Sequence, residues 1–208
     1  MKKLLSAAAL AAFAISGHAA LQGRDLDHNG FTDAFYDTDL NITWLKDANY
    51  ANTSGFDLDG KMTWAVANTW AAGLTIAGYN GWRLPTTTPG STCYKGCTDS
   101  EMGHLFYTEL GNTATNGGHN FGNFSNVQVT EINGHGANAY WSTTPRDANN
   151  AFEFFMYSGA QGFQGKGTAN YAMLVRVGDV PEPETYAMLL AGLGVMGAVA
   201  RRRKAPQA

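Results

Sequence analysis

Gly81-Trp82-Arg83-Leu84-Pro85-Thr86 stands near the middle of the 208-residue chain and carries its clearest structural signal. A turn is predicted just before it, at Gly78-Tyr79-Asn80-Gly81, because Asn and Gly tolerate the positive φ angles of tight turns. Residues 82–84 are predicted to form a short strand. Pro85 ends that strand, because proline has no N–H to donate to a sheet. The stretch therefore predicts β structure in the centre of the chain.

A helix is predicted on each side of this strand. In residues 62–74, apolar side chains recur every four residues with alanines between them, which is typical of an α-helix. In residues 98–110, Thr98 and Glu101 match a capping box, and Gly111 follows the last turn.

Short strands separated by Gly- and Asn-rich loops are predicted for much of the remaining chain. They are residues 31–36, 41–45, 121–124, 127–129, 139–143, 151–157 and 171–177. Because two helices come early and most strands come late, the expected class is α+β with a loop-rich antiparallel sheet.

The composition indicates one acidic, folded domain. Hydrophobic residues make up 44% of the chain and aromatic residues 12%, which is enough to build a core. Between residues 21 and 180, 8 Lys and Arg stand against 15 Asp and Glu. This excess of negative charge argues against nucleic-acid binding through phosphate neutralisation and favours the attraction of cations.

The first 19 residues have the three parts of a secretory signal peptide. Lys2 and Lys3 precede the apolar residues 4–15, and small residues follow as far as Ala20. We expect export by the Sec machinery and cleavage after Ala19, which leaves residues 20–179 as an extracytoplasmic domain. A retained membrane anchor is the alternative, although the apolar run is short for a span.

Residues 180–204 form a second three-part signal. Pro181, Glu182 and Pro183 precede an uncharged stretch at 186–200, and Arg201-Arg202-Arg203-Lys204 ends it. This order resembles the PEP-CTERM sorting signal of Gram-negative bacteria, a tail also described as the C-terminal domain of ice-binding proteins. The resemblance implies a single transmembrane sorting helix at 186–200 and removal near Pro181 by an exosortase. The protein would then reach the cell surface or the extracellular matrix; a permanent anchor is the alternative.

The segment between these two signals also resembles a known family. Besides residues 81–86, the matching parts are Ser100-Glu101-Met102, Tyr140-Trp141-Ser142-Thr143 and residues 172–177. They resemble a bacterial C-type-lectin-like domain of the kind found at the C-terminus of a collagen-like adhesin. Formylglycine-generating sulfatase modifiers are more distant relatives that run from Arg-Leu-Pro-Thr almost directly into a helix. Here a longer segment containing Cys93 and Cys97 intervenes.

This resemblance leaves two classes of function open. The first is a non-catalytic binding or adhesion module for polysaccharide or cell-surface glycan. The second is an enzyme of the modifier type or a hydrolase. The loop at residues 111–136, rich in Asn, Gly and His, lies where lectin-like folds usually contact their ligands.

The best candidate site is an oxygen-rich loop formed by Asp25, Asp27, Asn29 and Asp33. Its spacing around Gly30 follows the start of an EF-hand calcium loop, which combines oxygen ligands with a glycine at the turn. At the twelfth position, Tyr36 stands where that loop has Glu. The loop therefore predicts a calcium site, with a solvated turn of side-chain-capped residues as the alternative.

The remaining residues favour a protein without catalysis or a required cofactor. Cys93 and Cys97 are the only cysteines, and their spacing in an exported chain predicts a local disulfide. A copper-binding or catalytic pair, as in the modifiers, is the alternative. The sequence has no nucleophile elbow, P-loop or dinucleotide fingerprint, and the histidines of the domain are not spaced as a metal-binding pair.

Overall fold

The computed structural model describes residues 21–115, 117–129, 131–132, 135–136, 138–180, 190–193 and 196. The predicted signal peptide at 1–19, the Pro181-Glu182-Pro183 segment and the basic cluster lie outside the described residues. Of the predicted apolar helix at 186–200, residues 190–193 and 196 are helical. Within the described part of the chain, no helix is both long enough and apolar enough to cross a membrane.

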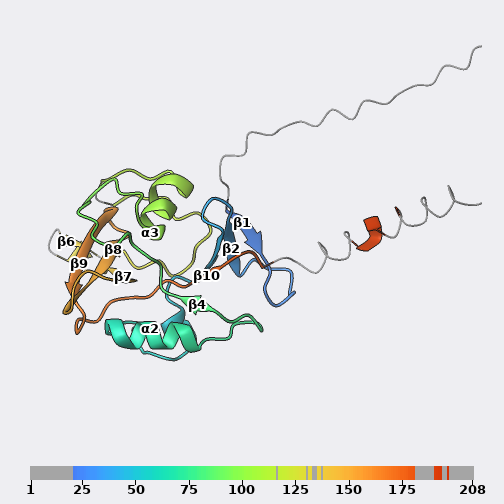
Figure 1. The fold of residues 1–208 in the computed structure, drawn as a ribbon, viewed down its shortest axis with the longest axis horizontal. Helices are drawn as coiled ribbons and strands as arrows, with labels where there is room; N and C mark the ends of the chain where they lie inside the picture. The colour runs from blue at the N-terminus through green and yellow to red at the C-terminus, as the bar shows by residue number, and fades with distance from the viewer. Residues whose placement is uncertain are drawn as a thin grey trace, which may run out of the picture.

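Two antiparallel sheets form the frame of the domain, with α3 above and α2 below them in the view of Figure 1. The larger sheet has the order β1-β2-β3-β10-β4, and the smaller has the order β7-β8-β9. The strands of the larger sheet are β1 (Gln22–Arg24), β2 (Ala34–Asp37), β3 (Ile42–Leu45), β4 (Trp82–Arg83) and β10 (Val175–Val177). Those of the smaller sheet are β7 (Tyr140–Pro145), β8 (Asn150–Phe155) and β9 (Ala160–Gly165). A separate pair consists of β5 (Glu131–Ile132) and β6 (His135–Gly136).

The helices are short and differ in part from the sequence prediction. They are α1 (Tyr50–Thr53), α2 (Trp64–Gly73), α3 (Glu101–His104) and η1 (Leu105–Glu109). The helix predicted at 98–110 begins at residue 101 and changes halfway from α to π geometry, where the Leu110 N–H donates to the Leu105 carbonyl. The predicted capping box is wrong: Ser100, not Thr98, caps the helix by accepting from the Gly103 N–H at 3.0 Å.

The α+β class with antiparallel sheets is confirmed, although individual strands differ. Residues 121–124 and 127–129 are not strands; near them, Ser125 makes an isolated bridge to Asp47. The prediction missed β1, β5, β6, β9 and α1. Residues 160–165 escaped it because Gly and Gln dominate them, so they lack the alternating apolar pattern of a half-buried strand.

Large aromatic side chains fill two cores, with Trp82 and Trp141 in the cluster that contains α2, and Trp44 in the cluster that contains α3 and η1. Trp44, Trp82 and Trp141 are at most 1% exposed. The indole N–H of Trp141 donates to the Met62 carbonyl at 2.8 Å, and that of Trp82 donates to the Tyr79 carbonyl at 3.0 Å. These two rings therefore bury a large apolar area without leaving their polar atoms unpaired.

A bidentate ion pair joins β4, an edge strand of the larger sheet, to the start of α3. Both outer nitrogens of the Arg83 guanidinium donate to the Glu101 carboxylate at 2.7 Å. The same carboxylate accepts from the Thr86 N–H at 2.7 Å. Glu101 thus holds the chain on both sides of Pro85, and the Arg-Leu-Pro-Thr stretch is fixed against the helix.

We expect Arg83→Lys to lower the free energy of unfolding by about 1 to 2 kcal/mol, because an ammonium cannot replace the two-pronged contact. Urea denaturation of both proteins measures this loss. The control is Arg176→Lys, since Arg176 makes single hydrogen bonds to the Asn80 and Asp179 carbonyls. It should cost less than about 0.5 kcal/mol. Equal losses in the two variants would contradict a special role for the Arg83 pair.

Candidate ligand-binding site

The predicted calcium loop connects β1 to β2, and its polar side chains close it. Asp25 accepts from the Gly30 N–H at 2.7 Å, Asn29 from the Phe31 N–H at 2.8 Å, and Asp33 from the Leu26 N–H at 3.0 Å. The strands on either side replace the two helices that flank an EF-hand loop. The loop is therefore a hairpin connection built from side-chain-capped turns.

Three of the four predicted ligands nevertheless converge. One carboxylate oxygen from each of Asp25, Asp27 and Asp33 lies within 4.8 Å of the others. The fourth residue, Asn29, donates its side-chain N–H to Asp27 at 3.0 Å. A carboxylate oxygen that accepts one N–H keeps a further lone pair, so these groups can still coordinate a hard cation.

The Asp25 carboxyl is held in its charged form. Partial burial raises its pKa, but hydrogen bonds from the Gly30 and Asn29 backbone N–H groups outweigh this effect and bring the pKa below the ordinary value of 3.8. The carboxylate is therefore negative at neutral pH, as a metal ligand must be.

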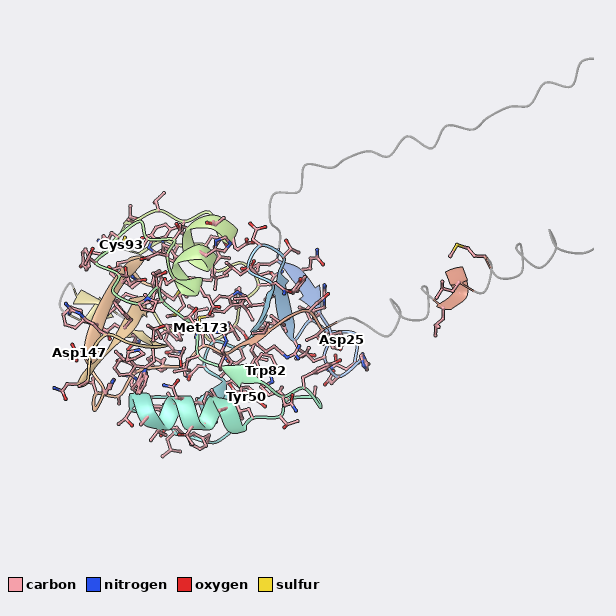
Figure 2. All side chains as sticks on the ribbon, in the orientation of Figure 1. Asp25, Tyr50, Trp82, Cys93, Asp147 and Met173 are labelled. Carbon is pink, nitrogen blue, oxygen red and sulfur yellow. A yellow bond between two sulfur atoms is a disulfide. The ribbon has the colours of Figure 1, made fainter. Side chains whose placement is uncertain are left out.

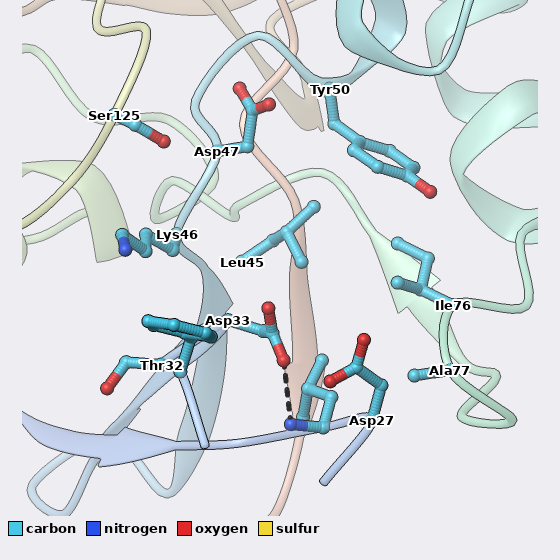
Figure 3. Close-up of a pocket in the computed structure, with 12 residues that line it drawn as sticks. Asp27, Thr32, Asp33, Leu45, Lys46, Asp47, Tyr50, Ile76, Ala77 and Ser125 are labelled. Carbon is cyan, nitrogen blue, oxygen red and sulfur yellow. Dashed lines mark hydrogen bonds between the residues drawn. The ribbon is translucent and has the colours of Figure 1, made fainter. Parts of the chain in front are cut away.

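Beside this loop lies a surface pocket of about 590 Å³. In Figure 3, the side chains of Asp27, Asp33, Leu45 and Ile76 turn toward one shared space. The lining combines apolar groups with three carboxylates, three hydroxyl groups and one cationic group: Leu26, Asp27, Phe31, Thr32, Asp33, Leu45, Lys46, Asp47, Tyr50, Ile76, Ala77 and Ser125. The pocket therefore offers both an apolar surface and hydrogen-bond acceptors to one ligand.

Backbone contacts between distant segments make the walls of this pocket. The Ser125 N–H donates to the Lys46 carbonyl at 3.0 Å, and the Ala48 N–H donates to the Ser125 carbonyl at 2.9 Å. On the other side, Ile76 and Tyr79 exchange two hydrogen bonds of 2.9 Å across a two-residue turn. This turn holds Ala77 at a φ of 50°, where glycine or asparagine is the usual residue.

Sequence reasoning found the Asp25–Asp33 part of this site and missed its opposite wall. Lys46, Asp47 and Tyr50 follow β3 and carry no motif, and Ser125 lies in a segment predicted as a loop between strands. Only the folded chain brings them to the aspartates.

In the described part of the Asn- and His-rich loop (residues 111–136), many polar side chains already form hydrogen bonds with other groups of the protein. The Asn112 side chain donates to the Asn120 carbonyl and accepts from the Asn120 N–H, and Asn126 donates to the Asp47 carboxylate at 3.0 Å. His119 contacts the Thr115 and Tyr157 carbonyls at 2.9 Å. The expected ligand loop thus reaches the pocket through Ser125, while these side chains shape the loop itself.

A second, smaller pocket of about 370 Å³ lies beside the cysteine loop. Cys93 and Cys97 are bonded to each other, with their Cα atoms 5.8 Å apart. The Gln161 N–H donates to the Tyr94 carbonyl at 2.7 Å and thereby ties this loop to β9. Glu153 and Phe163 line the pocket from the neighbouring strands.

The geometry so far defines an α+β domain with an open, acidic surface site, and comparisons with known proteins place it in a family. The family model of the Lcl C-terminal domain matches residues 33–176, and that of the PEP-CTERM protein-sorting motif matches residues 179–204. The chain therefore belongs to the Lcl C-terminal domain family and carries a PEP-CTERM sorting motif. Both resemblances predicted from the sequence are confirmed.

The sorting motif also indicates how the protein is exported and processed. It implies export, anchoring at the C-terminus in a membrane, and processing by an exosortase. No protein with a curated description matches the chain.

Glu153 in the smaller pocket makes the stability of the protein depend on pH. Burial raises its pKa from 4.5 to about 6, against the effect of the hydrogen bond from Asn170. The folded protein thus binds more protons than the unfolded chain between these values, so stability falls as pH rises through this window, by about 2 kcal/mol.

We expect Glu153→Gln to remove this share of the pH dependence. Urea denaturation from pH 4 to pH 7 should show the variant gaining about 2 kcal/mol on the wild type as pH rises. Asp57→Asn is the control, because hydrogen bonds lower the pKa of Asp57 and its titration lies below this window. A constant difference between Glu153→Gln and wild type would contradict the prediction.

Proposed function

We propose that this chain is an exported, non-catalytic binding module with a C-type-lectin-like fold, which takes a polysaccharide or cell-surface glycan in the pocket beside the aspartate loop. Residues 1–19 serve as the signal peptide, residues 20–179 form the binding domain, and residues 180–204 form the sorting signal. After exosortase processing in a Gram-negative host, the domain stays at the cell surface or in the extracellular matrix and acts in adhesion.

The chemistry of the pocket lining carries this proposal. Sugar hydroxyls donate hydrogen bonds to carboxylates, and the pocket presents those of Asp27, Asp33 and Asp47. Pyranose rings also pack their C–H faces against aromatic side chains. Phe31, 73% exposed at the edge of the pocket, offers such a surface at little cost, because few contacts must be broken to use it.

The cysteine pair supports a binding role over an enzyme of the modifier type. Those enzymes bind copper through cysteine sulfurs. In this chain Cys93 and Cys97 share a disulfide, and neither sulfur is available as a thiolate ligand.

A glycan array that includes exopolysaccharide from the producing strain tests the proposed function. We expect binding that Phe31→Ala weakens about tenfold, the loss typical of one aromatic contact. Phe163→Ala, which removes a half-exposed aromatic from the smaller pocket, should leave affinity unchanged. If Phe163→Ala abolishes binding and Phe31→Ala does not, the site has been placed in the wrong pocket. Absence of binding to every glycan would sink the proposal.

We further propose that Asp25, Asp27, Asn29 and Asp33 hold a structural calcium ion, which would order one wall of the pocket. Calcium at a hundredfold excess over its Kd stabilises a folded protein by about 2.7 kcal/mol, or several degrees in Tm. Melting in calcium and in chelator measures the shift, and magnesium should produce little of it because it demands tighter octahedral geometry.

Asp27→Asn should abolish this calcium shift. Asp147→Asn should preserve it, because Asp147 caps a similar exposed turn by accepting from the Asn149 and Asn150 N–H groups but joins none of the carboxylate clusters formed by the described residues. A melting temperature that does not respond to millimolar calcium would leave these aspartates as turn residues.

A further inference from the structure

A second cluster of metal-ligating side chains lies where the end of β2 meets the α3–η1 segment. His104 Nε2 is 3.2 Å from Glu109 Oε1 and 3.9 Å from Asp37 Oδ2. One such atom from each of the three residues lies within 4.8 Å of the other two. The side chains of Asp37, Glu109 and His104 are 0%, 1% and 15% exposed, so the cluster is buried with its histidine reaching the surface.

Two carboxylate oxygens of this cluster have no hydrogen-bond partner among the described residues. Asp37 Oδ1 accepts from the Asp39 and Leu40 N–H groups, whereas its Oδ2 atom, on the His104 side, is unpartnered. Glu109 Oε2 is unpartnered as well. A buried carboxylate oxygen without a partner is costly, and native proteins compensate such groups with a cation or a proton.

The charges around the cluster favour a cation. The titratable groups that act on the Glu109 carboxyl are Asp37, Asp39 and His104, and His104 alone among them can be positive. Two buried carboxylates thus share one weak base, and a divalent ion would balance them.

The π-helix brings two of these side chains together. In an α-helix, residues five apart point about 140° away from each other, since each residue advances by about 100°. The π turn η1 widens the helix by one residue per hydrogen-bonded ring, and the Leu110 N–H reaches the Leu105 carbonyl at 3.0 Å. His104 and Glu109 therefore face the same side. Such turns are rare and concentrate at functional sites.

We propose that Asp37, His104 and Glu109 bind a zinc ion, with water or an external ligand completing a tetrahedral site. Zinc accepts imidazole nitrogen and carboxylate oxygen at about 2.0 to 2.2 Å, which separates neighbouring ligand atoms by about 3.4 Å. The observed separations of 3.2 and 3.9 Å lie on either side of this value. Calcium needs six to eight oxygen ligands, so this site differs in chemistry from the aspartate loop. The ion would join the larger sheet to η1.

Zinc content of the full-length chain tests this proposal. After removal of metal by chelator and dialysis against zinc, elemental analysis should find one zinc per chain, and zinc should raise Tm. Calcium should not replace zinc. His104→Gln should weaken binding about 100-fold or more, whereas His119→Gln should bind normally, because His119 contacts backbone carbonyls elsewhere.

Glu109→Gln keeps the test decisive if His104→Gln does not fold. It removes a buried negative charge, so the metal-free variant should be at least as stable as the wild type while losing the zinc-induced Tm shift. Unchanged zinc uptake in both variants, or no uptake by the wild type, would overturn the proposal. Asp37, His104 and Glu109 would then form an ion cluster without a metal. Asp27→Asn and Phe31→Ala should both retain zinc, so failure here and failure of the proposed glycan site are distinguishable.

Discussion

The contact between the Arg83 guanidinium and the Glu101 carboxylate sets the arrangement of the rest of the domain. It joins β4 in the larger sheet to the helical segment through two hydrogen bonds of 2.7 Å each. The segment between them, with the disulfide, does not disturb this contact because its two ends pair. Thr87 bridges Ser100, and the Thr88 N–H donates to the Asp99 carbonyl at 2.9 Å. The inserted segment is thus a loop closed at its base by backbone pairing, which keeps its two ends together next to the ion pair.

Locally closed turns supply the acidic surface of the protein. In the loop between β1 and β2, and again at Asp57 and Asp147, a carboxylate accepts backbone N–H groups two to five residues further along the chain. Such turns need no core beneath them and keep their carboxylates charged and near water. Figure 2 shows Asp25 and Asp147 at opposite ends of the domain, so two of these acidic turns lie far apart on its surface. The surface is consequently suited to cations and to hydroxyl-bearing ligands.

The buried polar groups differ from these surface turns, because groups in the interior of the protein, and not water, must compensate them. Glu153 is compensated by a hydrogen bond from Asn170 at 2.7 Å, and its pKa rises to about 6. Asp37 and Glu109 are less well compensated, since each keeps an unpartnered oxygen. A domain of this size retains such groups at a cost in stability, which makes them the natural places to look for bound ions.

The sequence by itself determined the α+β class, the two family resemblances, the aspartate loop and the helix before β4, since these depend on local pattern and spacing. It did not reveal the wall of the pocket formed by Tyr50 and Ser125, because residues far apart in the chain carry no shared periodicity. Nor did it reveal that His104 and Glu109 meet. A regular α-helix over residues 98–110 would point the side chains of His104 and Glu109 in different directions. Only the packing of η1 against the sheets decides that the helix widens there. Tertiary contacts outweigh local propensity wherever the burial of a segment contributes more free energy than its own backbone preference.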